Sequence, residues 1–365
     1  MMLDEPGPGA VNLLDNARRY YGEALAGTAD LRTNACATTE APAPAVRAAL
    51  ARVHPEVRAR YYGCGLVAPE AIEGLRVLDL GCGAGQDAFV LAQLVGERGE
   101  VVGVDATPAQ LEVARRWRDW HASQAGLPQP NTRFIDGDIA RLGELGLEPG
   151  SFDLIVSNCV INLVADKPAV FRAAHELLRP GGEFYFADVY ADRRVPAACL
   201  ADPVLHGECL SGALYWGDFL AAAKAAGFGD PRLVNDRPIA ITDPAIAAKL
   251  TGVGFWSATW RLFRLDALEP ACEDYGQAVV YLGTIAGYET RLRLDKHHDI
   301  EAGRVFPVCG NSWRMLAETR FAPHFSFIGD FSRHYGIFPG CGVGCPFDPI
   351  GAIGASGAGA TPGCC

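Results

Sequence analysis

The chain has 365 residues, of which 49% are hydrophobic and 21% charged, and its formal net charge is -11. A chain of this length and composition can bury at least one large core and has room for two or three domains, which excludes a disordered or fibrous protein. The negative charge, without any long run of Lys or Arg, argues against binding to phosphate backbones or anionic lipid. We therefore expect no nucleic acid and no membrane among its partners.

The start of the chain, MMLDEPGPGAVNLL, carries acidic residues where a secretory signal needs basic ones, and no apolar signal core follows it. No apolar stretch anywhere approaches the roughly 20 residues that a membrane-spanning helix needs. These features predict a cytoplasmic protein.

The N-terminal part, residues 1–70, has a mainly helical pattern from residue 11 onward, with a loop rich in Thr, Asn and Cys at 32–40. Such a segment has to fold over another part of the chain. We expect residues 1–70 to form a helical lid.

The next part, residues 71–234, alternates short apolar runs with amphipathic stretches, which is typical of a parallel sheet with covering helices. Helices are indicated where apolar positions recur three and four residues apart, and a helical insert is expected from 190 to about 227. A turn at the RPGG sequence separates the last helix from its strand. The predicted strands are 77–81, 100–105, 133–136, 152–158 and 183–189, and the predicted helices are 86–95, 108–125 and 167–178.

The C-terminal part is predicted to hold a smaller mixed α+β domain at 235–335, because the alternation in 277–294 favours strands. The last stretch, 336–365, is rich in Gly, Ala and Pro and lacks the bulky residues of a core, so we expect a flexible tail that contains cysteines. The fold class is therefore α/β, with a Rossmann-like domain between a helical N-terminal segment and this C-terminal domain.

A glycine-rich turn joins the first predicted strand to its helix. Gly81, Gly83 and Gly85 form a GxGxG sequence, and Asp105 follows about 20 residues later at the end of the next strand. This arrangement lets the backbone approach a nucleotide-like ligand while a carboxylate binds ribose hydroxyls. The same turn also occurs where glycines serve sheet packing alone, so it is not sufficient evidence of a ligand.

Further polar residues strengthen the ligand interpretation. Asp79 lies within the first strand, where a buried acid is costly unless it is paired with loop amides or with a ligand's ammonium group. Asp138 and Ile139, in the sequence DGDI, follow the third strand at the height of an adenine ring. The turn lacks the longer GxGxxG spacing that brings a helix N-terminus onto a pyrophosphate, so a ligand without phosphates fits better than a dinucleotide.

The segments LDLGCGAGQD, GVDATPAQLEVA, GDI, SNCVINL and LRPGGEF resemble the successive motifs of class I S-adenosylmethionine methyltransferases. The resemblance implies S-adenosylmethionine as cofactor. Its sulfonium can also be contacted by the ring face of an aromatic residue. The residues expected to bind the cofactor are Tyr62, Asp79, Gly81, Gly83, Gly85, Asp105, Asp138, Ile139 and Asn158.

Three of the twelve cysteines stand where a ligand can reach them. Cys159 follows the fourth strand, at the sheet edge where doubly wound folds bind ligands. Cys209 lies in the helical insert, which can fold back over that edge, and Cys64 stands between two glycines, where little packs around a side chain. Each cysteine alone can also be a small buried hydrophobe. Three converging thiolates would suit a soft centre such as As(III), whereas a zinc site normally shows paired CxxC spacing.

Four segments, TNACATTE, RYYGCGLVAPE, SNCVINLVADK and HGECLSGALYW, are similar to the cysteine segments of the arsenite methyltransferase family, and the similarity extends from about residue 20 to 335. It implies catalytic roles for Cys36, Cys64, Cys159 and Cys209, with As(III) as substrate bound by the last three. It also implies that Cys36 and Cys64 supply two electrons by forming a disulfide. Thioredoxin or glutathione would then be the reductant.

Two other functions remain open at this point. A methyltransferase acting on carbon, nitrogen or oxygen needs only the same cofactor site, and a non-catalytic protein that sequesters metalloids needs only the thiols. The remaining groups are expected to be structural: Cys199, Cys272 and Cys309 show no ligand spacing, and His297 and His298 are predicted to lie in a solvated turn.

Overall fold

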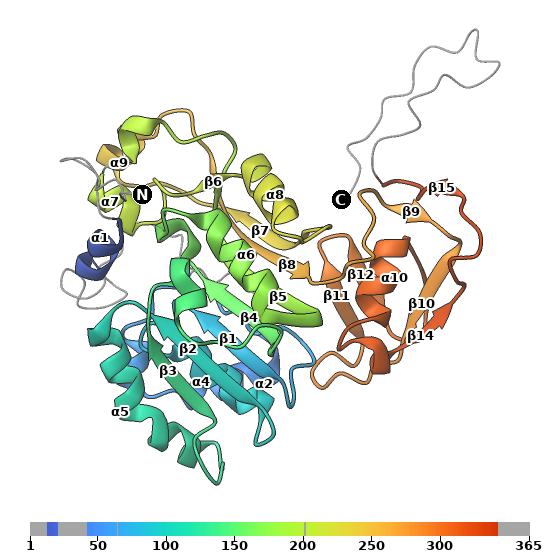
Figure 1. The fold of residues 1–365 in the computed structure, drawn as a ribbon, viewed down its shortest axis with the longest axis horizontal. Helices are drawn as coiled ribbons and strands as arrows, with labels where there is room; N and C mark the ends of the chain where they lie inside the picture. The colour runs from blue at the N-terminus through green and yellow to red at the C-terminus, as the bar shows by residue number, and fades with distance from the viewer. Residues whose placement is uncertain (1–12, 21–41, 64, 201, 342–365) are drawn as a thin grey trace, which may run out of the picture.

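The computed structural model describes residues 13–20, 42–63, 65–200 and 202–341, and Figure 1 shows a large α/β body joined to a smaller C-terminal one. The large body is built on one sheet with the strand order β3-β2-β1-β4-β5-β8-β7, and β6 pairs with β5. The strands from β1 to β5 run parallel, whereas β8 is antiparallel to β5 and to β7. The strands are β1 (Arg76–Leu80), β2 (Glu100–Asp105), β3 (Thr132–Asp136), β4 (Phe152–Asn158), β5 (Leu178–Ala191), β6 (Leu214–Tyr215), β7 (Arg232–Pro238) and β8 (Phe255–Phe263).

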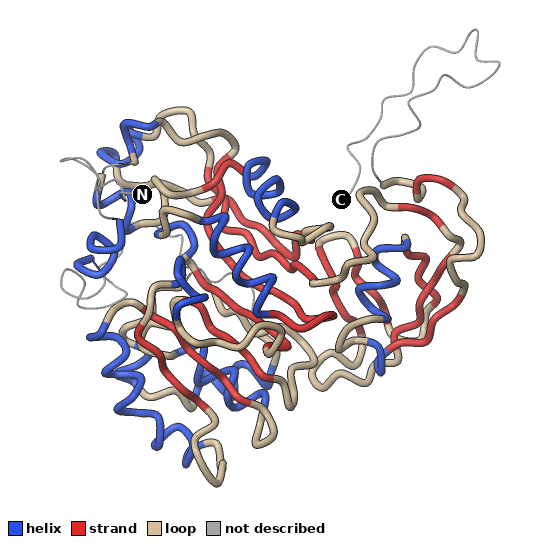
Figure 2. The backbone as a smooth tube through the Cα atoms, in the orientation of Figure 1, coloured by secondary structure: helices blue, strands red, loops and turns tan. Residues whose placement is uncertain are grey.

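Helices lie on both faces of this sheet (Figure 2). Successive residues of a strand point to opposite faces, so Val77 joins the core under α2, α4 and α5, while Leu78 joins the core under α6 and α8. This double burial explains why the strands read as continuous apolar runs. The helices of this body are α1 (Leu13–Arg19), α2 (Pro44–Ala51), α3 (Pro55–Arg58), α4 (Gln86–Val95), α5 (Pro108–Gln124), α6 (Lys167–Leu177), α7 (Pro203–Gly207), α8 (Trp216–Ala225) and α9 (Pro244–Lys249), with 3-10 turns η3 (Ile139–Glu144), η4 (Ile161–Leu163) and η5 (Ala197–Cys199).

The C-terminal body has its own apolar core. Its largest sheet has the order β13-β10-β14, and two strand pairs, β11 with β12 and β9 with β15, complete it. The elements are β9 (Glu273–Asp274), β10 (Gln277–Tyr281), β11 (Arg291–Asp295), β12 (His298–Glu301), β13 (Val305–Val308), α10 (Gly310–Ala317), η6 (Ala322–His324), β14 (Phe325–Ile328) and β15 (Gly336–Ile337). The predicted fold class, a Rossmann-like domain with a smaller mixed domain after it, is confirmed.

Three local expectations differ from the structure. The RPGG sequence lies within the first part of β5 and does not form a separate turn. Strand β5 already pairs with β4 at Leu178, opposite Phe152, and the pairing register shifts before Glu183. The large sheet extends beyond residue 234 through β8, so we propose Phe263 as the end of the first domain. The expected tail begins too early, since Gly336 and Ile337 pair with β9, and the rest of that tail, 342–365, lies outside the described residues.

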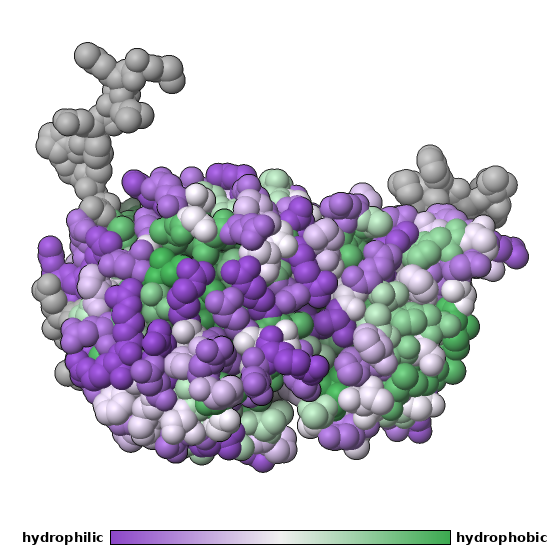
Figure 3. Space-filling view, turned by 60° about the horizontal axis from the view of Figure 1, so that its bottom comes forward, coloured by the Kyte–Doolittle hydropathy of each residue, from purple (hydrophilic) through white to green (hydrophobic). Residues whose placement is uncertain are grey.

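One face of the C-terminal sheet remains in solvent and is largely apolar. Val280 and Val305 pair across β10 and β13, so they point the same way, and Ile328 lies on that face through its pairing with Ala278. Val305 is 62% exposed and Ile328 45%. An apolar area is visible at the right-hand end of Figure 3, where the C-terminal body lies.

Within the described part of the chain, no helix is both long enough and apolar enough to cross a membrane.

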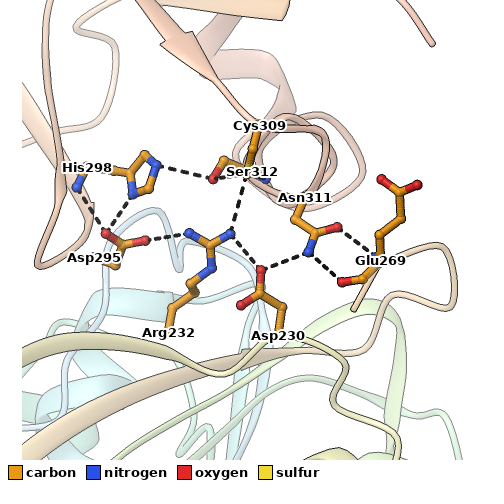
Figure 4. A network of polar contacts seen from close by, with 8 residues as sticks. All are labelled: Asp230, Arg232, Glu269, Asp295, His298, Cys309, Asn311 and Ser312. Atoms are coloured by element: carbon orange, nitrogen blue, oxygen red, sulfur yellow. Dashed lines mark hydrogen bonds and ion pairs between the residues drawn. The ribbon is translucent and has the colours of Figure 1, made fainter. Parts of the chain in front are cut away.

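The two bodies are joined by a buried polar network (Figure 4). Arg232 of β7, 3% exposed, forms ion pairs with Asp230 at 2.6 Å and with Asp295 of β11 at 3.1 Å. The Asp295 carboxylate also contacts Nδ1 of His298 at 2.7 Å, and the His298 ring reaches Ser312 of α10 at 3.4 Å. The expectation of a solvated turn is therefore wrong for His298, whose ring is buried in this network.

Candidate active site

A cavity of about 490 Å³ opens at the carboxyl ends of β1, β2 and β4, a volume typical of small-molecule sites. It lies where the strand order reverses, since β2 and β4 flank β1, and doubly wound folds bind ligands at that point. Eight of the nine residues expected to bind a cofactor line it, namely Tyr62, Asp79, Gly81, Gly83, Asp105, Asp138, Ile139 and Asn158.

The glycine-rich turn forms one wall of the cavity. Gly83 has a φ of +52°, and a Cβ added to it would meet no atom within 4 Å, so its backbone faces open space. Its amide donates a hydrogen bond to Oδ2 of Asp105 at 2.9 Å, while Oδ1 accepts one from the Thr107 amide at 2.7 Å. Asp105 therefore fixes the turn as well as lining the cavity.

Gly85 is the exception among the predicted cofactor residues, because it does not line the cavity. It precedes α4 with a φ of +91°, and an added Cβ would lie 3.0 Å from Phe89 and 3.3 Å from Ala114 and from Phe134. Its role is to let the turn pack against the core, the alternative that the sequence left open for such glycines.

Buried acids give the cavity its chemical character. Asp79 is 2% exposed and Asp87 is 5% exposed. Among the described residues, neither Oδ2 of Asp79 nor Oδ1 of Asp87 has a hydrogen-bond partner. Burial raises the pKa of Asp79 well above its usual value, helped by the nearby charges of Asp87 and Asp105, and burial raises the pKa of Asp87 to about 7. Unsatisfied buried carboxyl groups of this kind fit a cationic ligand, such as one bearing an ammonium and a sulfonium.

Asp87 is held in place by Asn158 at the end of β4. The Asn158 Nδ2 group lies 2.7 Å from Oδ2 of Asp87, 2.7 Å from the Tyr61 hydroxyl and 2.6 Å from the carbonyl oxygen of Gly65. The sequence analysis expected Asn158 at the pocket but did not assign Asp87, which lines the cavity as well.

The far wall is formed by residues after β3. Asp138 lines the cavity and also caps η3, because its Oδ1 accepts a hydrogen bond from the Ala140 amide at 2.9 Å. Ile139 is buried beside it. This pair offers a carboxylate and an apolar side chain at the height that the sequence assigned to an adenine ring.

Helix α1 closes one side of the cavity, which the sequence pattern did not resolve at the level of residues. Leu13, Leu14, Ala17 and Arg18 line it. The Arg18 Nε donates a hydrogen bond to the carbonyl oxygen of Ala106 at 2.8 Å, and just after the helix the Tyr20 hydroxyl donates one to Oε1 of Glu208 at 2.8 Å. The helix therefore touches both the cofactor side and the segment that carries Cys209.

Two of the predicted cysteines meet beside the cavity. Cys159 follows β4 and lines the cavity, and its amide donates to the carbonyl oxygen of Ala187 on β5 at 2.8 Å. Cys209 follows α7, and its Sγ donates to the carbonyl oxygen of Cys159 at 3.4 Å. The two Sγ atoms and a carboxylate oxygen of Asp188 all lie within 4.8 Å of one another. Cys159 also takes part in a disulfide in this structure, so its thiol becomes available only after reduction.

Cys36 and Cys64 lie outside the described residues, so their expected roles stay predictions. The residue that sequence reasoning missed is Asp188, which lies on β5 within the apolar run EFYFADV. Burial raises the pKa of Asp188 to about 7, although hydrogen bonds from the Val189 and Asn162 amides and the positive charge of Lys167 act in the opposite direction. Lys167 is itself buried, which lowers its pKa despite the nearby Asp188 and Cys209.

Comparison with known families agrees with this geometry. Residues 72–227 match the model of a methyltransferase domain, and residues 275–335 match the model of an arsenite methyltransferase C-terminal domain. The fold, the acidic cavity at the switch point of the sheet and these matches define an S-adenosylmethionine-dependent methyltransferase of class I.

The particular family follows from individual relatives. The chain is 58% identical over 342 residues to an arsenite methyltransferase of Aquipseudomonas alcaligenes, covering 94% of this chain and 98% of that protein. It is 44% identical over 315 residues to an arsenite methyltransferase of Mus musculus, covering 86% of this chain and 82% of that protein. A crystal structure of an arsenic (III) S-adenosylmethionine methyltransferase from Chlamydomonas reinhardtii superposes with a TM-score of 0.79 at 50% identity, covering 82% of this chain and all of that one. The chain belongs to the arsenite methyltransferase family.

Proposed function

We propose that this protein transfers methyl groups from S-adenosylmethionine to trivalent arsenic bound by the thiolates of Cys64, Cys159 and Cys209. The observation that carries the proposal is the approach of the Cys159 and Cys209 sulfur atoms to within 4.8 Å beside a cavity lined by buried acids. Thiolate sulfur is the donor that a soft metalloid prefers over oxygen or nitrogen.

The protein's part in the reaction is to bind and to orient. When bound, S-adenosylmethionine supplies an electrophilic methyl group on a positively charged sulfur. Asp79 and Asp87 stabilise that positive charge, and the Gly83 backbone allows the ligand to approach closely. Cys159 lines the cavity, so it holds the arsenic with its lone pair facing the methyl donor. No general base is required, because the arsenic lone pair is itself the nucleophile.

Each methyl transfer oxidises arsenic by two electrons. Two thiolates that form a disulfide return those two electrons, and we propose Cys36 and Cys64 as that pair. The disulfide at Cys159 supports the view that thiols of this site are oxidised and reduced in turn. Every turnover then needs an external dithiol or monothiol reductant, which we propose to be thioredoxin or glutathione in the cytoplasm.

The test is a methylation assay with labelled S-adenosylmethionine, arsenite and a thiol. We expect labelled methylarsenicals from the wild type and, for Cys159→Ser or Cys209→Ser, a loss larger than the roughly 10–100-fold that removal of an outer-shell partner costs a metal site. The matched control is Cys199→Ser, since Cys199 is also buried but does not line the cavity, and its Sγ donates to the carbonyl oxygen of Lys249 at 3.4 Å. Label in an organic acceptor, or full activity of both variants, would refute the proposal.

The redox pair is tested by a change of substrate. Cys36→Ser is expected to reduce methylation of arsenite more than methylation of monomethylarsenite, because the monomethyl substrate needs only two protein thiols. Initial rates with excess reductant measure this ratio. An equal loss on both substrates would contradict the role assigned to Cys36.

A further inference from the structure

A carboxylate that no motif indicated lies against the two sulfur atoms of the site. Asp188 is 2% exposed, Cys159 5% and Cys209 3%, so all three groups are shielded from water. One carboxylate oxygen of Asp188 lies within 4.8 Å of both Sγ atoms. A buried acid next to a substrate site needs an explanation, because taking a charged group out of water is costly even when it is hydrogen-bonded.

The orientation of this carboxylate is fixed from the protein side. Asp188 Oδ1 accepts hydrogen bonds from the Val189 amide at 2.8 Å and from Nδ2 of Asn162 at 2.7 Å, and Oδ2 accepts one from the Asn162 amide at 3.1 Å. The Asn162 Nδ2 group also donates to the carbonyl oxygen of Val189 at 2.6 Å. These bonds fasten η4, the turn after Cys159, to β5, and they aim the carboxylate with little freedom.

The chemistry of trivalent arsenic determines which substituent of the substrate the Asp188 carboxylate would contact. A thiol bonds to trivalent arsenic by exchanging its proton for an arsenic-bound hydroxide, so each new As–S bond releases one water molecule. When Cys159 and Cys209 have both reacted with arsenous acid, one hydroxyl group remains on arsenic. When they have both reacted with the monomethyl acid, the third substituent is a methyl group.

We propose that Asp188 accepts a hydrogen bond from the hydroxyl group of arsenic held by Cys159 and Cys209, and that it thereby favours inorganic over monomethylated arsenic. This inference rests on the proposed function and names a specificity residue for it. Asp188 acts at the stage with two As–S bonds, before a third thiol displaces the last hydroxyl. A methyl group in that position leaves the buried carboxylate facing an apolar group, and a site built to accept a hydrogen bond discriminates strongly against a ligand that lacks the donor.

The experiment compares kcat/KM for arsenite and for monomethylarsenite in three proteins. For Asp188→Ala, we expect the ratio of the two values to shift toward the methylated substrate by roughly tenfold or more, the worth of one hydrogen bond to a charged group. Asp119→Ala is the control, because Asp119 is an exposed acid of α5 that pairs with Arg118, far from this carboxylate in the chain. Both values are expected to stay unchanged in it.

A binding readout makes the result independent of catalysis and of the variant's stability. The Cys64→Ser variant lacks the third thiol, so arsenic bound to it should keep its bonds to Cys159 and Cys209 and its last hydroxyl group. Arsenic X-ray absorption of this reduced variant with arsenite is expected to show two sulfur neighbours and one oxygen. Equilibrium dialysis then compares arsenite with monomethylarsenite, and arsenite is expected to bind more tightly with Asp188 present. An unchanged substrate ratio in Asp188→Ala, or equal losses on both substrates, would overturn the inference. Retained arsenite binding when Cys159→Ser or Cys209→Ser is added to the Cys64→Ser background, which leaves a single site thiol, would instead overturn the proposed function.

Discussion

Cys159 and Cys209 share a backbone feature that separates them from ordinary core cysteines. Among the described residues other than glycine, the residues with positive φ are Ala71, Cys159 at +56° and Cys209 at +59°. This left-handed conformation is strained for any residue with a Cβ, and strain of this kind persists where function requires it. Both sulfur atoms thus reach the site from turns that a glycine would adopt more easily.

Glycine is therefore expected to be tolerated better than alanine at position 209. The free energy of unfolding of Cys209→Gly should be about 1 kcal/mol higher than that of Cys209→Ala, since only the alanine retains the strained Cβ. At Cys199, which lies in η5 without a positive φ, the order should be the usual one, with glycine the less stable. Urea denaturation of the four variants measures both differences. The same order at the two positions would contradict the strain argument.

Asp87 is expected to link cofactor binding to pH. Its pKa is raised to about 7 in the folded protein without ligand, so the group is largely protonated at pH 6 and ionised at pH 8. A cationic ligand favours the ionised form, so the affinity for S-adenosylmethionine should rise by up to about tenfold from pH 6 to pH 8, with proton release at the lower pH. Calorimetry in two buffers of different ionisation enthalpy measures this. Asp87→Asn should flatten the dependence, whereas Asp119→Asn, on the exposed side of α5, should leave it intact.

Residue types and spacing predict part of this site and miss the rest for a physical reason. Asp79, Asp105 and Cys159 follow from the rule that strand ends meet at one edge of a parallel sheet. Cys209 reaches that edge only because α7 and its insert pack over β4 and β5, so resemblance and not spacing identified it. Asp188 is hidden because it interrupts an apolar run by a single polar residue, and nothing local shows that its neighbours in space are sulfur atoms.

At the scale of elements, α1 and the α7 segment act as one unit over the site. Helix α1 lines the cavity through Leu13 and Ala17, and the Tyr20 that follows it contacts the α7 segment through Glu208. The fit is tight, since a Cβ added to Gly207 would lie 2.5 Å from the Tyr20 ring. The position of α1 therefore depends on a small residue two positions before Cys209.

Gly207→Ala should displace α1 and weaken the binding of S-adenosylmethionine several-fold, because the added methyl group has to push the Tyr20 ring away. Gly143→Ala is the control, since a Cβ there meets no atom within 4 Å. Equilibrium binding of the cofactor to both variants gives the comparison. Wild-type affinity in Gly207→Ala would show that α1 does not close the cavity in solution.

Helices and strands of the large sheet are the part of the fold that periodicity predicts well. The predicted strands at 100–105 and 152–158 and the helix at 86–95 have the bounds of β2, β4 and α4. Periodicity fails at β5, where the paired glycines of RPGG indicate a turn but the chain continues as a strand through a register shift. It also cannot place α1, because the contacts of that helix are with residues far away in the sequence.

At the scale of the whole molecule, the C-terminal body is locked to the methyltransferase body by buried charge. Arg232 on β7 is enclosed by Asp230 and Asp295, and the carboxylate of Asp295 also bonds the His298 ring. Burial acts to raise the pKa of Asp295, but the hydrogen bond with His298 and the charge of Arg232 hold that pKa well below its usual range. The orientation of the two bodies is thus set by a network in which every charge has a partner of opposite sign.

Substitution of Arg232, the cation at the centre of this network, should lower the free energy of unfolding. Arg232→Met removes the cation that pairs with both Asp230 and Asp295, so we expect a loss of about 3 kcal/mol in the free energy of unfolding. Arg291→Met is the matched control, because its ion pair with Asp299 is exposed and should contribute less than about 1 kcal/mol. Urea unfolding followed by tryptophan fluorescence separates the two. Equal, small losses would mean that the network does not hold the bodies together.

The central claim is that one arsenic atom is bound by sulfur from Cys159 and Cys209 at the mouth of the cofactor cavity. Arsenic K-edge X-ray absorption of the reduced protein loaded with one equivalent of arsenite measures the sulfur neighbours directly. We predict an all-sulfur shell in the wild type that loses one sulfur in Cys159→Ser and one in Cys209→Ser, and stays whole in Cys199→Ser. A sulfur shell that is unchanged in both active-site variants would contradict the account.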